Sequence, residues 1–118
     1  MARILLAEDD DSLRGFLGRA LERAGHDLTI CSNGDEAISA LDNGPWDLLL
    51  TDIVMPGADG IEVAREAAQR QPELRIMFIT GFAAVALSAA QSAPQAKVLS
   101  KPVHLRDLVA EVERMIAA

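Results

Sequence analysis

The sequence alternates between short apolar runs and longer segments in which apolar residues recur every three or four positions. A short run that is apolar throughout is typical of a strand covered by helices on both faces, whereas the longer spacing is typical of an amphipathic helix. Repeated strand–helix units predict an α/β fold with a parallel sheet. The expected strands are residues 4–7, 28–31, 48–50, 76–79 and 98–99.

Helices are expected between and after these runs. For the first one, Asp11 and Ser12 are the candidate N-terminal caps, and Gly25 is the expected end. The segment 83–93 is mostly Ala and Ser, with Val85 and Leu87, so a helix there would bury little apolar area and should be the softest element. The expected helices are residues 13–24, 37–41, 61–67, 83–93 and 105–116.

Composition bounds the class of protein. A chain of 118 residues that is half hydrophobic can bury one core, so we expect a single domain over residues 1–118. The net charge of −7 argues against a nucleic-acid partner or an anionic membrane surface, both of which call for clustered Lys and Arg. The first apolar run stops at Glu8, which is too short for a signal peptide or for membrane insertion. We therefore expect a soluble cytoplasmic protein.

Three other residues have ordinary interpretations. Cys31 has no second cysteine to pair with and is expected to be a small buried side chain at a strand end. His26 falls in an expected turn and His104 at the start of the last helix. Nothing in the sequence pairs either histidine with a metal or a base, so both are expected on the surface without a donor role.

Polar residues stand where the strands are expected to end. Asp52 closes the third apolar run, and the acidic residues 8–10 follow the first. Thr80 follows the fourth run, and Lys101 follows the fifth. In open parallel sheets, ligands bind at the carboxyl ends of the strands, at the point where the strand order reverses. The sequence therefore predicts that these side chains share one site.

The chemistry of such a site follows from its charges. Carboxylates that converge would repel one another unless a cation lay among them, and Mg²⁺ suits oxygen ligands of this kind. Asp52 could also be a nucleophile that forms an aspartyl phosphate, with Lys101 and Thr80 contacting the phosphoryl oxygens. Each residue alone has a simpler explanation: residues 8–10 as a helix N-terminal charge cluster, Lys101 as a solvated lysine, and Thr80 as a residue bonded to its own turn through Gly81.

Together these residues resemble the receiver domain of two-component response regulators, over essentially the whole chain. The matching pieces are Glu8-Asp9, Asp52 within residues 51–60, Thr80, and Lys101-Pro102. The resemblance implies a flavodoxin-like (βα)5 doubly wound sandwich, with a five-stranded parallel sheet in the order 2-1-3-4-5. Because the chain ends directly after the last expected helix, we expect a receiver domain with no output domain.

The resemblance also implies roles for residues. Asp52 would accept a phosphoryl group from a phosphohistidine on a histidine kinase or histidine phosphotransferase, with Thr80 and Lys101 beside it. The protein would then be a switch and not an enzyme, with only its own phosphorylation and dephosphorylation as chemistry. Family members usually have a cis peptide bond at the position of Lys101-Pro102. The implied Mg²⁺ ligands are Asp9 and Asp52 directly, Glu8 mainly through water, and the backbone carbonyl of Val54.

The chain departs from the family pattern at three positions. Many receivers have Tyr or Phe three residues before the lysine, where this chain has Val98, so the usual aromatic switch is absent. Val54 and Phe82 stand where the family often has polar residues that tune the loss of phosphate. Apolar groups there would hinder an attacking water, and we therefore expect slow self-dephosphorylation.

Residues 77–87 and 98–108 are similar to alphaproteobacterial single-domain receivers. That similarity implies an adaptor for the ClpXP protease, with the ClpX unfoldase and protease substrates as partners, active when unphosphorylated and switched off by a cell-cycle phosphorelay. A phosphate sink or shuttle is an alternative. A small Mg²⁺-dependent aspartyl-phosphate hydrolase is another, but such an enzyme often needs a second carboxylate two residues after the nucleophile, where this chain has Val54. A flavin or nucleotide carrier would need a Gly- or Ser/Thr-rich loop in place of residues 8–10.

Overall fold

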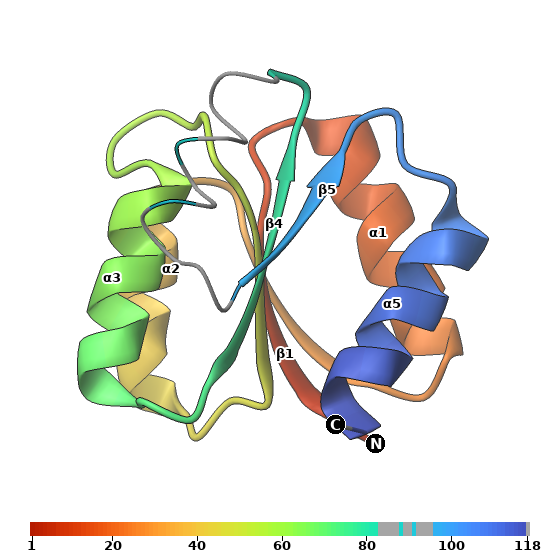
Figure 1. The fold of residues 1–118 in the computed structure, drawn as a ribbon, viewed down its shortest axis with the longest axis horizontal. Coiled ribbons are helices and arrows are strands. Elements are labelled where there is room, and N and C mark those ends of the chain that lie inside the picture. Colours follow the sequence, from red (N-terminus) through yellow and green to blue (C-terminus); the bar gives the residue numbers. More distant parts are fainter. Residues whose placement is uncertain (83–87, 89–90, 92–95, 118) are drawn as a thin grey trace.

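The computed structural model describes residues 1–82, 88, 91 and 96–117. Its strands form one parallel five-stranded sheet in the order β2-β1-β3-β4-β5, which confirms the expected fold (Figure 1). All five expected strands are present, each longer than its apolar run by one or two residues. The strands are β1 (Arg3–Ala7), β2 (Asp27–Cys31), β3 (Leu48–Asp52), β4 (Arg75–Thr80) and β5 (Lys97–Ser100).

Helices cover both faces of the sheet. One face carries α1 (Asp11–Arg23) and α5 (Leu105–Ala117), which lie side by side in Figure 1. The other face carries α2 (Gly34–Ala40), which continues into the 3-10 helix η1 (Leu41–Asn43), and α3 (Gly60–Arg70). The helix expected over residues 83–93 lies outside the described residues except at positions 88 and 91.

The start of α1 corrects one prediction. Asp10, and neither Asp11 nor Ser12, is the N-cap, and its side chain accepts a hydrogen bond from the Leu13 amide at 2.9 Å. The backbone of Asp10 is still extended, so the first helical residue is Asp11. Consecutive aspartates offer the same capping oxygen at each position, which is why sequence alone misses the register. Gly25 follows the helix with a positive φ of 96°, as expected for a helix end.

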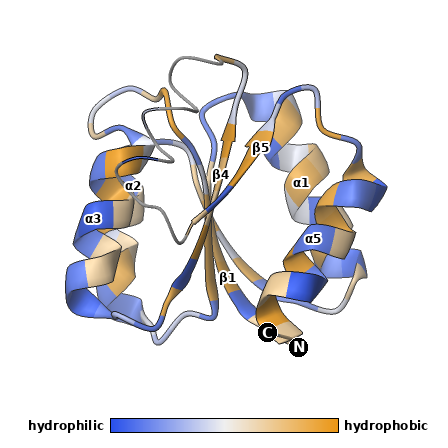
Figure 2. Ribbon diagram, viewed as in Figure 1, coloured by the Kyte–Doolittle hydropathy of each residue, from blue (hydrophilic) through white to orange (hydrophobic). Residues whose placement is uncertain are grey.

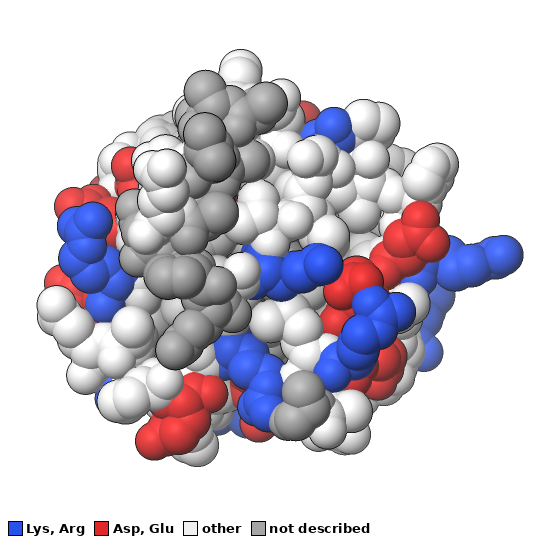
Figure 3. Space-filling model, viewed as in Figure 1, with Lys and Arg blue, Asp and Glu red and all other residues white. Residues whose placement is uncertain are grey.

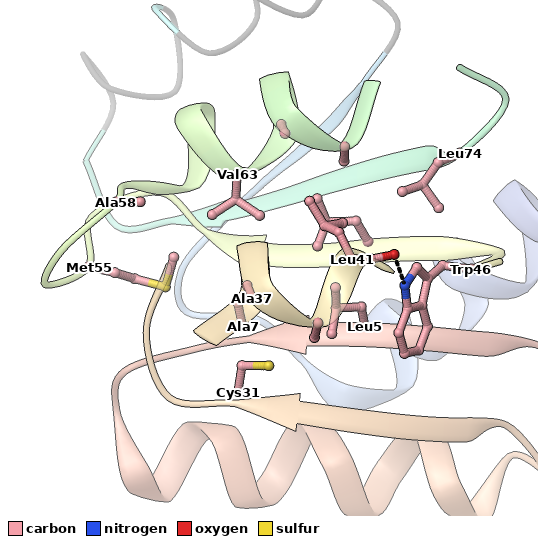
Figure 4. Packing of buried hydrophobic residues seen from close by; sticks show 14 of the residues in the cluster. Leu5, Ala7, Cys31, Ala37, Leu41, Trp46, Met55, Ala58, Val63 and Leu74 are labelled. Carbon is pink, nitrogen blue, oxygen red and sulfur yellow. Dashed lines mark hydrogen bonds between the residues drawn. The ribbon is translucent and has the colours of Figure 1, made fainter. Parts of the chain in front are cut away.

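The core lies in two layers, one on each face of the sheet. Successive residues of a strand point to opposite faces, and in β1 Leu5 joins one layer while Ile4 and Leu6 join the other. Apolar residues therefore make up most of the central strands and the sides of the helices that face the sheet, as the colouring of the ribbon in Figure 2 shows. Figure 4 shows the layer beneath α2 and α3, where the indole nitrogen of Trp46 donates to the Leu41 carbonyl at 3.1 Å. This burial on both faces confirms the interpretation of the uniformly apolar runs.

The surface carries charges of both signs. On the face shown in Figure 3, basic and acidic side chains are interspersed around β5 and α5. There Lys97 lies 3.9 Å from Glu111, which also pairs with Arg114. Among the helices of the described residues, none is long and apolar enough to cross a membrane.

The two histidines differ from each other. His104 is exposed, as predicted, but the surface prediction for His26 is wrong. His26 is buried, its Nδ1 accepts from the Ala2 amide at 3.2 Å, and its Nε2 lies 2.8 Å from a carboxylate oxygen of Glu113. Both partners are distant in sequence, so local spacing gave no sign of them.

Cys31 is buried, as expected, at the end of β2. Burial, with a smaller contribution from the charge of Glu36, raises the pKa of the Cys31 thiol to about 11. A thiol with so high a pKa is protonated at neutral pH and is a poor nucleophile, which supports its interpretation as a packing residue.

Gly60 brings α3 into direct contact with the end of β3. Its amide donates to the Ile53 carbonyl at 2.7 Å, and a Cβ at this position would lie 2.1 Å from the Asp52 carbonyl oxygen. Gly34, at the start of α2, meets the same loop, since its Cβ would lie 1.8 Å from the Ala58 carbonyl oxygen. The loop after Asp52 is thus in close backbone contact with two helices, at Gly60 and at Gly34, and neither contact leaves room for a side chain.

Replacing Gly60 by alanine should therefore destabilise the fold. Because the neighbouring atoms are backbone and cannot rotate away, we expect Gly60→Ala to lower the free energy of unfolding by about 1–3 kcal/mol. Gly15→Ala is the matched control, because its Cβ would meet only the flexible end of Arg19, at 3.2 Å. Alanine is also the better helix former, so the control should be neutral or stabilising by up to about 1 kcal/mol. Urea unfolding measures both, and equal stability of the two variants would contradict the steric argument.

Candidate functional site

The sheet register gathers the expected site residues at one edge. Ala7 of β1 pairs with Thr51 of β3, so the residues that follow them, Glu8 and Asp52, lie at the same level. Thr80 pairs with Ser100, and Lys101 follows directly, with its amide donating to the Thr80 carbonyl at 2.8 Å. This edge, where the arrowheads of β4 and β5 lie, is at the top of Figure 1. Strand pairing thus brings together residues that are far apart in sequence.

Asp52 is the last residue of β3 and is only 6% exposed. Its Oδ1 accepts a hydrogen bond from the Ile53 amide at 2.7 Å, and its Oδ2 accepts one from the Lys101 ammonium at 3.0 Å. Both carboxylate oxygens therefore have fixed donors, and the ammonium charge balances the carboxylate.

Glu8 is the most buried charged residue of the site, at 1% exposure. Its Oε2 accepts from the Asp10 amide at 3.1 Å, whereas Oε1 accepts no hydrogen bond from the part of the chain that the structure describes. That oxygen lies 3.4 Å from the Lys101 ammonium and forms an ion pair with it. Burial, assisted by the neighbouring Asp52 charge, raises the pKa of Glu8 to about 7, against the lowering effects of the Asp10 amide and of Lys101.

Lys101 connects the two carboxylates. Its side chain is 28% exposed and contacts both Asp52 and Glu8. Lys101 is therefore not the solvated surface lysine that its residue type alone would suggest. Partial burial lowers the pKa of Lys101, but the hydrogen bond and charge of Asp52, together with Glu8, raise it above its ordinary value overall. Lys101 is therefore positively charged throughout the physiological pH range. The Lys101-Pro102 peptide bond is cis, as the family resemblance implied.

Three carboxylates meet at this edge. Glu8, Asp9 and Asp52 each offer an oxygen within 4.8 Å of the others, with Asp9 exposed and the other two buried. A buried oxygen without a hydrogen bond, beside two more carboxylates, is a donor set that fits a hard divalent cation such as Mg²⁺. The open side of the cluster, at Asp9, would leave room for water ligands, which Mg²⁺ usually keeps.

The remaining expected residues lie around this cluster. Thr80 is buried at the end of β4, and its hydroxyl oxygen accepts from the Phe82 amide at 3.2 Å, so it is bonded to its own turn. Val54, in the loop after β3, and Phe82, after β4, are both exposed beside the site. Val98 lies in β5, partly buried against the core. The roles of Thr80, Val54 and Phe82 toward a phosphoryl group stay predictions.

One residue of the site was missed by the sequence analysis. Arg14, in α1, donates from its Nη1 to the carbonyl oxygen of Glu8 at 3.0 Å. The available signal was spacing, because Arg14 lies one helical turn after the N-cap Asp10 and can reach back over the loop. The contact is to a backbone carbonyl, so the side-chain types in the sequence do not indicate it.

Comparisons with known proteins agree with one another. The response regulator receiver domain family matches residues 4–113. The response regulator receiver protein CpdR of Brucella abortus is 60% identical over 119 residues, which cover 100% of this chain and 99% of that protein. The DNA-binding transcriptional regulator NtrC of Salmonella typhimurium is 39% identical over 117 residues, covering 97% of this chain but only 24% of NtrC.

Solved structures give the same result. TrrA of Thermotoga maritima, a response regulator crystallised in complex with Mg²⁺-BeF, matches with a TM-score of 0.87 at 28% identity, covering 98% of this chain and 99% of that one. The CheY-like receiver domain protein of Methanospirillum hungatei matches with a TM-score of 0.91 at 26% identity, covering 99% and 94%. The receiver domain of the hybrid histidine kinase CckA matches with a TM-score of 0.83 at 28% identity, covering 97% and 98%.

The raised pKa of Glu8 predicts how the stability of the metal-free protein depends on pH. A carboxyl whose pKa is higher in the folded state than in the unfolded state favours folding at low pH, and this advantage is lost as the pH rises from about 4.5 to about 7. In EDTA, we expect the wild type to lose about 3 kcal/mol of unfolding free energy relative to Glu8→Gln across this window. Urea unfolding at pH values from about 5 to about 8 measures the difference. A constant difference between the two proteins would show that Glu8 titrates normally.

Proposed function

The chain belongs to the response regulator receiver family, and on that premise we propose that it is a phosphorylation-controlled switch in which Asp52 accepts a phosphoryl group. Its similarity to the receiver protein CpdR over the whole of that protein indicates a regulator and not a catalytic enzyme. The observation that carries the assignment of Asp52 is its contact with Lys101, 3.0 Å away, inside the cluster that also contains Glu8 and Asp9. Asp52 is the carboxylate of this cluster that contacts Lys101 by a hydrogen bond.

Glu8, Asp9 and Asp52 would hold Mg²⁺, with the backbone carbonyl of Val54 as a further ligand. Bound there, Mg²⁺ would neutralise the charge on the phosphoryl oxygens and hold them near Asp52. The chain's own part is to keep these carboxylates together, which it does by burying Glu8 and Asp52 at the edge of the sheet.

In the proposed transfer, a carboxylate oxygen of Asp52 attacks the phosphorus of a phosphohistidine. An oxygen–phosphorus bond forms, the phosphorus–nitrogen bond breaks, and its electron pair returns to the imidazole of the donor. Lys101 would contact the incoming phosphoryl oxygens as a fixed positive charge. Thr80 is the acceptor in its bond with the Phe82 amide, so this bond leaves the hydroxyl hydrogen free, and within the described residues it could donate to a phosphoryl oxygen.

The proposed phosphodonor is a histidine kinase or a histidine phosphotransferase, and the switch would operate in the cytoplasm. For the output, we propose an adaptor of the ClpXP protease that contacts the ClpX unfoldase and protease substrates when unphosphorylated. The identity of 60% to CpdR of Brucella abortus, over 99% of that protein, supports this output and supports a receiver that acts without an attached output domain. Phosphorylation at Asp52 would change the partner-binding surface and end the interaction.

Phosphoacceptor chemistry is tested with acetyl phosphate on a phosphate-affinity gel. We expect a shifted band for the wild type in Mg²⁺ and no shifted band for the wild type in EDTA. Asp52→Asn keeps the shape of the side chain but removes the nucleophile, so it should give no shifted band in either condition. Glu22→Gln, on the exposed side of α1, is a control that should shift like the wild type. A band that persists in Asp52→Asn would assign the phosphoryl group to another residue.

The adaptor output is tested by the binding of purified ClpX. We expect the unphosphorylated protein to bind and the phosphorylated protein to bind at least about tenfold more weakly, a difference of about 1.4 kcal/mol. Asp52→Asn should bind ClpX both with and without acetyl phosphate, since it cannot be switched. Binding of neither form, or stronger binding of the phosphorylated form, would contradict the proposed output but would leave the phosphoacceptor chemistry intact.

A further inference from the structure

Arg14 folds its side chain back over the loop that carries the acidic residues. Its Nη1 lies 3.0 Å from the Glu8 carbonyl oxygen and 3.5 Å from the Asp9 carbonyl oxygen, and its Nη2 lies 2.5 Å from a carboxylate oxygen of Asp11. The side chain is 21% exposed, which is low for an arginine on a surface helix. The guanidinium is therefore fixed in place between the loop and the first turn of α1.

Three other backbone groups of the same loop are also bonded within the fold. The Glu8 amide donates to the Cys31 carbonyl at 3.1 Å, and the Asp10 amide donates to the Glu8 side chain at 3.1 Å. The Asp10 carbonyl accepts from the Arg14 amide at 2.8 Å. The carbonyls of Glu8 and Asp9 point to Arg14, so one side chain fixes the orientation of two successive peptide groups. Those peptide orientations determine where the carboxylates of Glu8 and Asp9 lie.

We propose that Arg14 is a positioning residue of the metal site, which holds the loop so that Glu8 and Asp9 lie beside Asp52 before a cation binds. The proposal rests on the proposed function, because it assumes that these carboxylates bind Mg²⁺. Ligands that are held in advance cost less conformational entropy when the ion arrives, and loss of a residue that orients ligands typically weakens metal binding by about 10–100-fold.

The charge of Arg14 acts in the opposite direction, because a guanidinium near the cluster repels a cation. That charge is compensated on its other side by Asp11, at 2.5 Å. It also acts on Glu36, whose pKa is held low by hydrogen bonds from Ser32 and, to a smaller degree, by Arg14. Because Asp11 and Glu36 both offset the charge of Arg14, its repulsion of a cation at the carboxylate cluster should be smaller than its positioning effect.

The two effects predict opposite results for Arg14→Met, which removes both the charge and the donors. If Arg14 positions the loop, the Mg²⁺ dissociation constant should rise about tenfold, as measured by calorimetric titration with MgCl₂ at low salt. Arg14→Lys keeps the charge and one donor group, so it should recover part of the affinity. Arg19→Met is the matched control, because Arg19 lies on the same helix, 5.3 Å from the Phe16 ring, and its loss changes the net charge equally. Its dissociation constant should stay within about twofold of the wild type.

Urea unfolding in EDTA separates positioning from a general effect on the fold. A lower stability of Arg14→Met with an unchanged dissociation constant would overturn the proposal, as would tighter binding, which would show that only the charge matters. The more conservative Arg14→Lys provides the same test if Arg14→Met does not fold. Failure of the wild type to bind Mg²⁺ would overturn the proposed function, and this inference with it, whereas normal binding by the wild type and both Arg14 variants would overturn this inference alone.

Discussion

The structure depends on the meeting of three carboxylates at one edge of the sheet, two of them buried. Ionised carboxylates in such a place repel one another and lose hydration, so the arrangement is costly without a positive charge. Lys101 supplies one, at 3.0 Å from Asp52 and 3.4 Å from Glu8. One oxygen of Glu8 has no hydrogen bond from the described residues, and the pKa of Glu8 is raised, which together indicate that one lysine does not balance the cluster. The negative charge that remains after Lys101 is counted would attract a divalent cation.

The rest of the fold keeps these groups in place. Parallel strands align Ala7 with Thr51 and Thr80 with Ser100, so the carboxyl ends deliver their polar residues to one edge. Apolar layers on both faces make β3 rigid, and Gly60 lets α3 begin against the Asp52 carbonyl. Asp52 therefore sits on β3, whose five residues are all buried. The packed core therefore fixes the position of the strands that carry the site residues.

Much of this arrangement could be predicted from sequence. Uniformly apolar runs predicted the buried strands, and polar residues at their ends predicted the site, because both follow from local pattern and the geometry of parallel sheets. The strand order came from family resemblance. What failed needed contacts between distant segments or backbone detail: the cap at Asp10, the burial of His26 against Glu113, and the contacts of Arg14 with loop carbonyls. Periodicity contains no information on such contacts.

Asp52 is the proposed phosphoacceptor among three neighbouring carboxylates. The most direct test of this assignment is chemical mapping, because borohydride reduces an acyl phosphate to an alcohol and thus converts a phosphorylated aspartate into homoserine. The protein would be phosphorylated with acetyl phosphate in Mg²⁺, reduced, digested and sequenced by mass spectrometry. Homoserine at position 52, absent when Mg²⁺ is withheld, is the predicted result. Reduction at Glu8 or Asp9 instead, or at position 52 without any dependence on Mg²⁺, would contradict the account.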